Sequence, residues 1–209
     1  MEEKTLTGNP DLVDPGFDCP PDNPLHLLQC WLDTADQLKI SEPRGLVLST
    51  VSDRGIPSSR VVLLKTVDEK GVTFASSDVS QKGKDLKTNP VAAGTLWWRE
   101  TMQQINFYGH VKKLSSEFSD KTFKDRTLEA QAIAMISSQS APMLNEKDIY
   151  EKISDLLQYP EKIFRPNNWH AYHITIESME FWHGSKDRFH QRLRYEINNN
   201  TWQHLRLQP

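Results

Sequence analysis

Polar and apolar positions alternate with a period of two along several segments of this chain, the pattern of strands with one buried face. The clearest case is 103–111, where Gln104 and Asn106 share one face. Further strands are predicted over 45–51, 60–65, 72–76, 91–98, 169–176, 180–182 and 202–207. The turn that ends in Gly71 predicts an antiparallel hairpin between 60–65 and 72–76.

A longer apolar period marks the helices. Asn23 and Pro24 form an N-cap and first helical position, and the apolar stripe after them predicts a helix that ends near Ile40. Asn145 caps a second clear helix, and shorter ones are predicted from Ser80 and over 115–126. Residues 127–135 stay ambiguous. The pattern predicts a mainly β (α+β) fold, an antiparallel barrel or sandwich with peripheral helices.

The first 22 residues follow neither period. Four prolines and scattered acidic residues predict a flexible arm over 1–22 that orders against a partner. Residues 23–209 are then predicted to form a single domain, since turn signals recur at short intervals throughout.

Composition narrows the function classes. A net charge of -3 provides no diffuse basic field, which argues against a nucleic-acid surface. Neither a secretory signal nor an apolar run of roughly 20 residues is present, so we expect a cytoplasmic protein without a membrane span. The two cysteines are expected to be free thiols, and His170 and His173, three apart on a predicted strand, point to opposite faces and do not form a metal site.

Cations and hydroxyl groups gather where the short polar helix begins. The free N–H groups at its N-terminus, the Ser80 hydroxyl and Lys82 form a candidate phosphate site, which Arg60 reaches from the neighbouring strand. The competing interpretation is a solvated surface helix, because lysine-rich helix starts are common on protein surfaces. Arg188, His190 and Arg192 present the same choice, between a surface loop and the cationic wall of a site.

Several motifs, in this order, resemble the pyridoxamine-phosphate-oxidase-like flavoprotein family. They are RVVLLK at 60–65, SQKG at 80–83, NP at 89–90, QQI at 103–105, SSQS at 137–140 and EFWHGSKDRFHQRLRY at 180–195. The resemblance covers residues 40–209. It implies an FMN-binding split antiparallel β-barrel that works as a homodimer, with two flavins at the subunit interface.

The resemblance also implies a set of site residues. Those around FMN are Arg60, Val61, Lys65, Ala75, Ser76, Gln81, Lys82, Gln104, Gln139, Ser140, Trp182 and Arg192. Those on the substrate side are Lys65, Arg126, Arg188 and His190, of which Arg188 and His190 are the implied catalytic pair.

Three departures bear on the substrate. The vitamin-forming oxidases hold a substrate phosphate with Lys, Tyr, Arg and Ser, whereas here Lys65 and Arg126 remain but Thr122 and Ala130 occupy the other two positions. The family also usually has a second cation where Gln81 stands and an aliphatic residue at position 189, which is phenylalanine here. These departures predict weaker binding of a pyridoxine phosphate.

Other segments are similar to family members that act in phenazine biosynthesis: TLTG at 5–8, EPRGLVL at 42–48, WRETMQQI at 98–105 and RLQP at 206–209. The expected activity is an FMN-dependent oxidase that acts late in phenazine biosynthesis on a small aromatic carboxylate, with O₂ as electron acceptor. Two alternatives stay open, a pyridoxine/pyridoxamine 5′-phosphate oxidase and a flavin-binding protein without catalysis.

Overall fold

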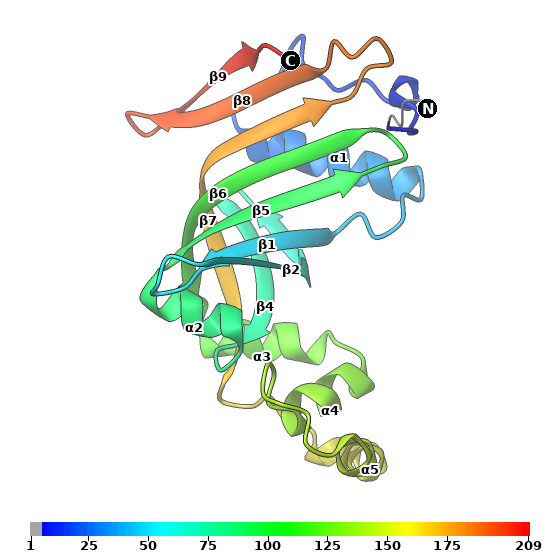
Figure 1. Ribbon diagram of the computed structural model, residues 1–209, viewed down its shortest axis with the longest axis vertical. Coiled ribbons are helices and arrows are strands. Elements are labelled where there is room, and N and C mark those ends of the chain that lie inside the picture. Colours follow the sequence, from blue (N-terminus) through cyan, green and yellow to red (C-terminus); the bar gives the residue numbers. More distant parts are fainter. Residues whose placement is uncertain (1–5) are drawn as a thin grey trace.

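One curled antiparallel sheet carries the fold in this computed structural model, which describes residues 6–209 (Figure 1). The strands are β1 (Gly45–Val51), β2 (Pro57–Leu63), β3 (Thr66–Asp68), β4 (Gly71–Ser77), β5 (Val91–Trp98), β6 (Gln103–Lys113), β7 (Trp169–His183), β8 (Gln191–Asn198) and β9 (Thr201–Leu207). The helices are α1 (Pro24–Gln37), α2 (Gln81–Thr88), α3 (Ser116–Lys124), α4 (Leu128–Ile136) and α5 (Glu146–Leu157). Short 3₁₀ turns lie at Pro10–Leu12 and Pro160–Lys162.

The sheet curls into a split barrel around its longest strand. The strand order is β2-β1-β5-β6-β7-β4-β3, and β8 and β9 continue from β7. One end of β7 pairs with β4 and the other with β8, while β6 runs along both parts. The β6–β7 register shifts at Gly109, where a Cβ would lie 2.0 Å from the Thr175 carbonyl oxygen, so only glycine fits this bend. The predicted mainly β split barrel with peripheral helices is confirmed.

Helix α1 covers the sheet and supplies much of the core. Its apolar stripe buries Leu28 and Leu32 completely, each a gain of roughly 2 kcal/mol over exposure. Trp31 stacks on Phe17 at 5.9 Å and meets Phe181 edge-on at 5.1 Å, so this tryptophan packs in the core.

Part of the predicted arm belongs to the same core. Phe17 is only 5% exposed, the Trp31 indole donates to the Pro15 carbonyl at 3.1 Å, and the Tyr195 hydroxyl donates to the Pro21 carbonyl at 2.9 Å. Pro15, Phe17 and Pro21 therefore pack on α1 and β8 of the same chain. Residues 1–5 lie outside the described residues, as does the first position of the TLTG segment.

One local prediction, the hairpin between 60–65 and 72–76, needs correction. The turn at 68–71 does form a hairpin, but its first strand is the short β3, whereas 60–65 falls largely in β2, which pairs with β1. The main partner of β4 is β7. The sequence missed this because a short-range turn signal does not show where a neighbouring apolar run finds its partner. The ambiguous segment 127–135 is helical, as α4.

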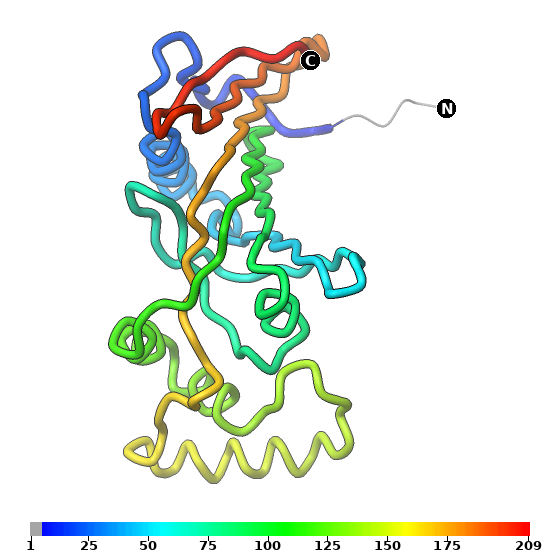
Figure 2. Tube along the Cα trace, turned by 90° about the vertical axis from the view of Figure 1, so that its left-hand side faces the viewer, coloured from blue at the N-terminus to red at the C-terminus, as the bar shows by residue number. Residues whose placement is uncertain are grey.

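Helices α3 to α5 lie at one end of the molecule, where α3 packs on β7 and α4 and α5 extend away from the sheet (Figures 1 and 2). None of the helices in residues 6–209 is both long enough and apolar enough to cross a membrane. The cytoplasmic location stays a prediction.

Candidate functional site

The start of α2 forms a buried cationic corner. Ser80 caps the helix through its hydroxyl, which accepts the Gly83 N–H at 3.3 Å. Lys82 is only 6% exposed, and its Nζ donates to Ser80 Oγ at 3.2 Å and to Gln139 Oε1 at 3.3 Å. Burial, assisted by the nearby charge of Arg60, lowers the pKa of Lys82 to about 8. The corner therefore holds a cation that no carboxylate contacts within the described residues.

A cleft of about 600 Å³ opens beside this corner. It is lined by Arg60, Val61, Val62, Leu63, Lys65, Ala75, Ser76, Lys82, Asp125, Arg126, Thr127, Ala130 and Gln139. Four of these residues are cationic and one is acidic. Burial and the charge of Arg126 lower the pKa of Lys65, and burial lowers that of Arg126. A cleft with this excess of positive charge and this volume suits an organic anion.

Gln81 and Ser140 lie beside the cleft. The Gln81 side chain donates to Asp85 Oδ1 at 2.8 Å, and its backbone N–H donates to Ser140 Oγ at 3.2 Å. Ser140 has a positive φ of 73°, which turns the 137–140 segment toward α2. Gln139 Oε1 also accepts from Ser76 Oγ at 3.3 Å. The loop of hydroxyl residues is thus part of the cleft wall.

The remaining predicted residues gather at the other end of β7. Gln104 on β6, Trp182 on β7 and Arg192 on β8 are register neighbours. Trp182 packs against Trp97 and His190, with ring centroids 6.1 Å and 4.7 Å apart. Two openings of about 390 Å³ each adjoin them, one lined by Leu6, Trp97, Gln104 and Trp182, the other by Leu6, Gly8, Met102, Ser185, Lys186, Arg188 and His190.

The polar groups of this second cluster have defined orientations. Arg192 donates to Glu180 Oε1 at 2.8 Å and to the Gln208 carbonyl at 3.2 Å. The Ser185 N–H donates to His190 Nδ1 at 3.0 Å, so the neutral ring carries its proton on Nε2. Arg188 is exposed and has a positive φ of 66°.

Within one chain, the predicted site residues therefore form two separate clusters. Ser76 of the cleft pairs with His170, and Gln104 pairs with Trp182, at the opposite end of β7. The distance between these positions is roughly 40 Å along the strand at 3.3 Å per residue. The two clusters therefore lie toward opposite ends of β7 within one chain.

Sequence reasoning missed Asp85 and Thr50. Asp85 is buried on α2, four positions after Gln81, and Thr50 is buried on the inner face of β1. The spacing of four residues between Gln81 and Asp85 could have predicted that the two side chains meet, because positions four apart lie on one face of a helix. Thr50 follows Leu46 and Leu48 at every second position of β1, so the alternating pattern could also have predicted that its side chain is buried.

Comparisons with known proteins agree with the fold. Residues 32–157 match the family described as pyridoxamine 5′-phosphate oxidase, and residues 169–209 match the pyridoxine 5′-phosphate oxidase C-terminal dimerisation region. The chain is 37% identical over 206 residues to a dihydrophenazinedicarboxylate synthase of Burkholderia lata, covering 99% of this chain and 97% of that protein. It is 38% identical over 189 residues to a pyridoxine/pyridoxamine 5′-phosphate oxidase of Mannheimia succiniciproducens, covering 90% of each.

Solved structures show the same architecture. The crystal structure of PhzG from Burkholderia lata 383 in complex with tetrahydrophenazine-1-carboxylic acid matches with a TM-score of 0.93 and 37% identity, covering 97% of this chain and all of that one. A pyridoxamine 5′-phosphate oxidase-related, FMN-binding protein from Nostoc punctiforme shares the fold, with a TM-score of 0.75 over 89% of this chain and 98% of that one at 16% identity. The fold and the cleft together place this protein in the class of split-barrel flavoproteins.

This chain belongs to the pyridoxamine 5′-phosphate oxidase family, and it is an FMN-dependent oxidoreductase. The residues present fit FMN as the cofactor. Lys82 is a buried cation without a contacting carboxylate among the described residues, and the N-terminus of α2 and Arg60 adjoin it. This is the environment that a phosphate monoester requires.

Proposed function

We propose that this protein is an FMN-dependent oxidase that acts late in phenazine biosynthesis and oxidises partly reduced phenazine carboxylic acids with O₂ as electron acceptor. The observation that carries the proposal is the end-to-end similarity to dihydrophenazinedicarboxylate synthases, 37% identity over 99% of this chain for the Burkholderia lata protein. The structure matched at a TM-score of 0.93 is a complex with a partly reduced phenazine carboxylic acid.

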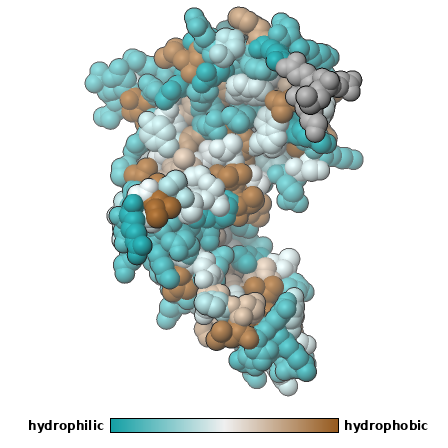
Figure 3. Space-filling model, in the orientation of Figure 1, coloured by the Kyte–Doolittle hydropathy of each residue, from teal (hydrophilic) through white to brown (hydrophobic). Residues whose placement is uncertain are grey.

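We also propose that the working enzyme is a homodimer with FMN at the subunit interface. The two site clusters lie at opposite ends of β7, so a second copy is needed to place one against the other. The dimerisation region at 169–209 contains Trp182, Arg188, His190 and Arg192. Apolar side chains on the outer faces of β1, β2 and β5 are exposed, among them Val47 at 37%, Val61 at 69% and Trp97 at 38%. In Figure 3, brown apolar atoms lie in separate groups in the middle of the face, among white and teal atoms.

In this arrangement the cleft residues anchor the cofactor. Arg60, Ser76 and Lys82 hold the phosphate, while Gln139 and Ser140 contact the ribityl chain or flavin edge. Val61, Ala75, Lys65 and Gln81 complete this wall. Trp182, Gln104 and Arg192 approach the flavin from the second copy. The bound flavin supplies two-electron redox chemistry, and hydrogen peroxide is the product of O₂ reduction.

The substrate residues bind and orient a carboxylate-bearing ring. Arg188 pairs with the substrate carboxylate, and His190, with its proton on Nε2, donates a hydrogen bond to the ring system or moves a proton. Lys65 and Arg126 provide a second anion site within the cleft. Thr122 does not contribute a hydroxyl to it, because its Oγ1 donates to the Phe118 carbonyl at 2.8 Å.

Oxygen consumption tests the proposal. Purified holoprotein given a dihydro- or tetrahydrophenazine carboxylic acid is expected to consume O₂ and produce peroxide well above the rate of spontaneous oxidation. Absence of enzymatic consumption with every reduced phenazine carboxylate tested would exclude this function.

A pyridoxine/pyridoxamine 5′-phosphate oxidase is the second candidate. It is favoured by Lys65 and Arg126, which are half of the family's substrate phosphate clamp and line the cleft together. The same assay with pyridoxamine 5′-phosphate separates the two, since the phenazine oxidase is expected to turn it over much more slowly. Protein that is yellow but consumes no O₂ with either substrate would instead be a flavin-binding protein without catalysis.

A further inference from the structure

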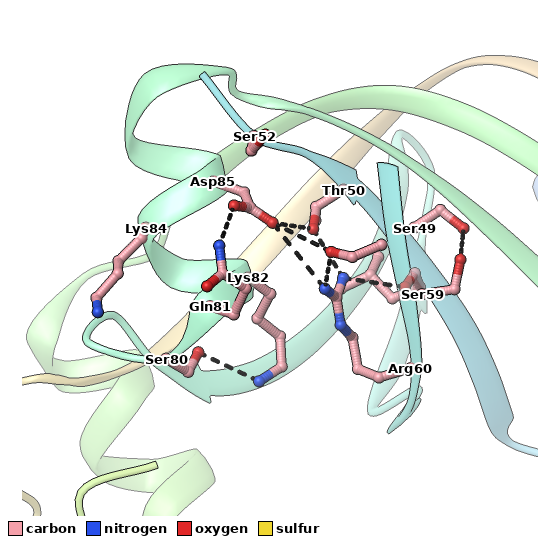
Figure 4. A network of polar contacts seen from close by, with 12 residues as sticks. Ser49, Thr50, Ser52, Ser59, Arg60, Ser80, Gln81, Lys82, Lys84 and Asp85 are labelled. Atoms are coloured by element: carbon pink, nitrogen blue, oxygen red, sulfur yellow. Dashed lines mark hydrogen bonds and ion pairs between the residues drawn. The ribbon is translucent and has the colours of Figure 1, made fainter. Parts of the chain in front are cut away.

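Asp85 lies behind the phosphate corner and does not line the cleft. It is only 2% exposed on α2 (Figure 4). Its Oδ2 accepts hydrogen bonds from Thr50 Oγ1 at 2.6 Å and Ser58 Oγ at 3.4 Å. Its Oδ1 accepts from the Gln81 amide at 2.8 Å. A buried carboxylate with this many donors has a fixed position.

The two hydroxyls connect Asp85 to Arg60. Thr50 and Ser58 are register partners on β1 and β2, on the face that also carries Arg60. Arg60 Nη1 donates to Thr50 Oγ1 at 2.7 Å and to the Leu48 carbonyl at 3.2 Å, while Nη2 donates to Ser58 Oγ at 2.5 Å. A hydroxyl has a single hydrogen, so a hydroxyl that donates to Asp85 directs its lone pairs at the guanidinium.

The charge of Asp85 acts in the same direction. Burial on its own raises the pKa of Asp85, but hydrogen bonds from Thr50 and Gln81 and the charge of Arg60 lower it overall, so the carboxylate stays ionised. Oδ2 lies 4.0 Å from Arg60 Nη2. The guanidinium is therefore held between the ionised carboxylate behind it and the cleft in front of it.

We propose that Asp85 is a positioning residue that holds the Arg60 guanidinium, through the hydroxyls of Thr50 and Ser58, in the orientation that receives the FMN phosphate. This inference rests on the proposed role of Arg60 as a phosphate anchor. An arginine ordered before the ligand arrives loses little further side-chain entropy on binding, which strengthens binding without a new contact to the ligand. The same carboxylate also orients the Gln81 amide, at the position where the family usually has a second cation.

Thr50→Val tests the relay, because it removes the hydroxyl that joins Asp85 to Arg60 and keeps the shape of the side chain. FMN dissociation constants are measured on the full-length apoprotein by quenching of flavin fluorescence, and thermal melting of the apoprotein reports whether each variant folds. Thr50→Val is expected to weaken FMN binding about tenfold, the scale of one hydrogen bond to a charged group. Thr50→Ser restores the hydroxyl and is expected to recover most of the affinity.

Ser49→Ala is the matched control. Ser49 is the neighbour of Thr50 on β1, and its hydroxyl pairs with Ser59 at 2.7 Å, away from Arg60 (Figure 4). It is expected to leave FMN affinity unchanged. Ser58→Ala is a second relay variant at a less buried position, with a smaller loss expected in the same direction.

Combination with Arg60→Ala completes the test. In that background Thr50→Val is expected to have almost no further effect on FMN affinity, because the group that it positions is gone. Wild-type affinity in folded Thr50→Val and Ser58→Ala proteins, or losses that simply add to that of Arg60→Ala, would overturn the proposal. It also fails if Arg60→Ala alone leaves FMN affinity unchanged. Failure of the proposed function is a separate result, since it appears as absent phenazine oxidation in wild-type protein that binds FMN normally.

Discussion

The two clusters of site residues use similar side chains in opposite settings. At the start of α2 the cations are buried and bonded to their own chain: Lys82 is 6% exposed, and Arg60 has three partners on β1 and β2. At the far end of β7, the proposed substrate residues Arg188 and His190 lie in a loop, where Phe189 is 70% exposed and Arg188 has a positive φ.

Under the proposed function, this difference corresponds to two roles within one fold, a buried cofactor anchor and an exposed substrate loop. A cofactor anchor benefits from order before binding, because rigid groups lose little entropy when the ligand arrives. The proposed substrate loop must admit and release its ligand at every turnover, so exposure to solvent is an advantage there. Four experiments test the contrast, in order of decreasing expected effect.

The largest effect is expected from Lys82→Met. Removal of a buried cation is expected to weaken FMN binding about a hundredfold, the scale of two charge-assisted hydrogen bonds, while the apoprotein keeps or gains thermal stability because a desolvated charge is lost. Fluorescence titration and apoprotein melting measure the two effects. Lys84→Met, on an exposed position of the same helix, is the control. If Lys82→Met binds FMN as tightly as the wild-type protein, the corner around Lys82 does not bind the FMN phosphate.

The pH dependence of FMN affinity isolates the same lysine. A bound phosphate raises the pKa of Lys82, so affinity is complete below the value of about 8 in the free protein and falls as pH rises through it. The dissociation constant is expected to rise up to about tenfold per pH unit above pH 8, or about thirtyfold by pH 9.5. The Lys82→Met variant is expected to lack this pH dependence. If the dependence persists in the variant, a group other than Lys82 causes it.

Arg188→Ala tests the exposed cluster by steady-state O₂ consumption with a reduced phenazine carboxylate. We expect KM to rise about tenfold with a smaller change in kcat, because the residue binds a carboxylate that is present in both ground and transition states. Lys147→Ala, which removes an exposed cation on α5 that pairs with Glu151, is the control. A fall in kcat as large as the rise in KM would contradict a purely binding role.

The smallest effect is expected from Ala130→Ser, which restores one member of the family's phosphate clamp in the cleft. One added hydrogen bond is expected to lower KM for pyridoxamine 5′-phosphate about fivefold. Ala134→Ser, one turn later on α4 and outside the cleft lining, is the control. No change with Ala130→Ser would show that Lys65 and Arg126 do not form a phosphate subsite.

Local pattern was sufficient for much of the fold. Helix α1 and strands β1, β5, β6 and β9 arise from periodicity, caps and turns that act over a few residues, and the predictions for them are confirmed. Strand β8, the partner of β9, was not predicted. The family motifs were sufficient to predict the cofactor and most residues that line the cleft, because the polar and charged residues of each motif lie at neighbouring positions in the sequence.

Only the tertiary structure decided which distant segments meet. It paired β2 with β1 instead of β4, brought Phe17 into the core, and separated Ser76 from Trp182 along β7. It also placed Asp85 behind Arg60, from a helix 25 positions further along the chain. Such contacts depend on how the long strand β7 bends and what it packs against, and no local period records that.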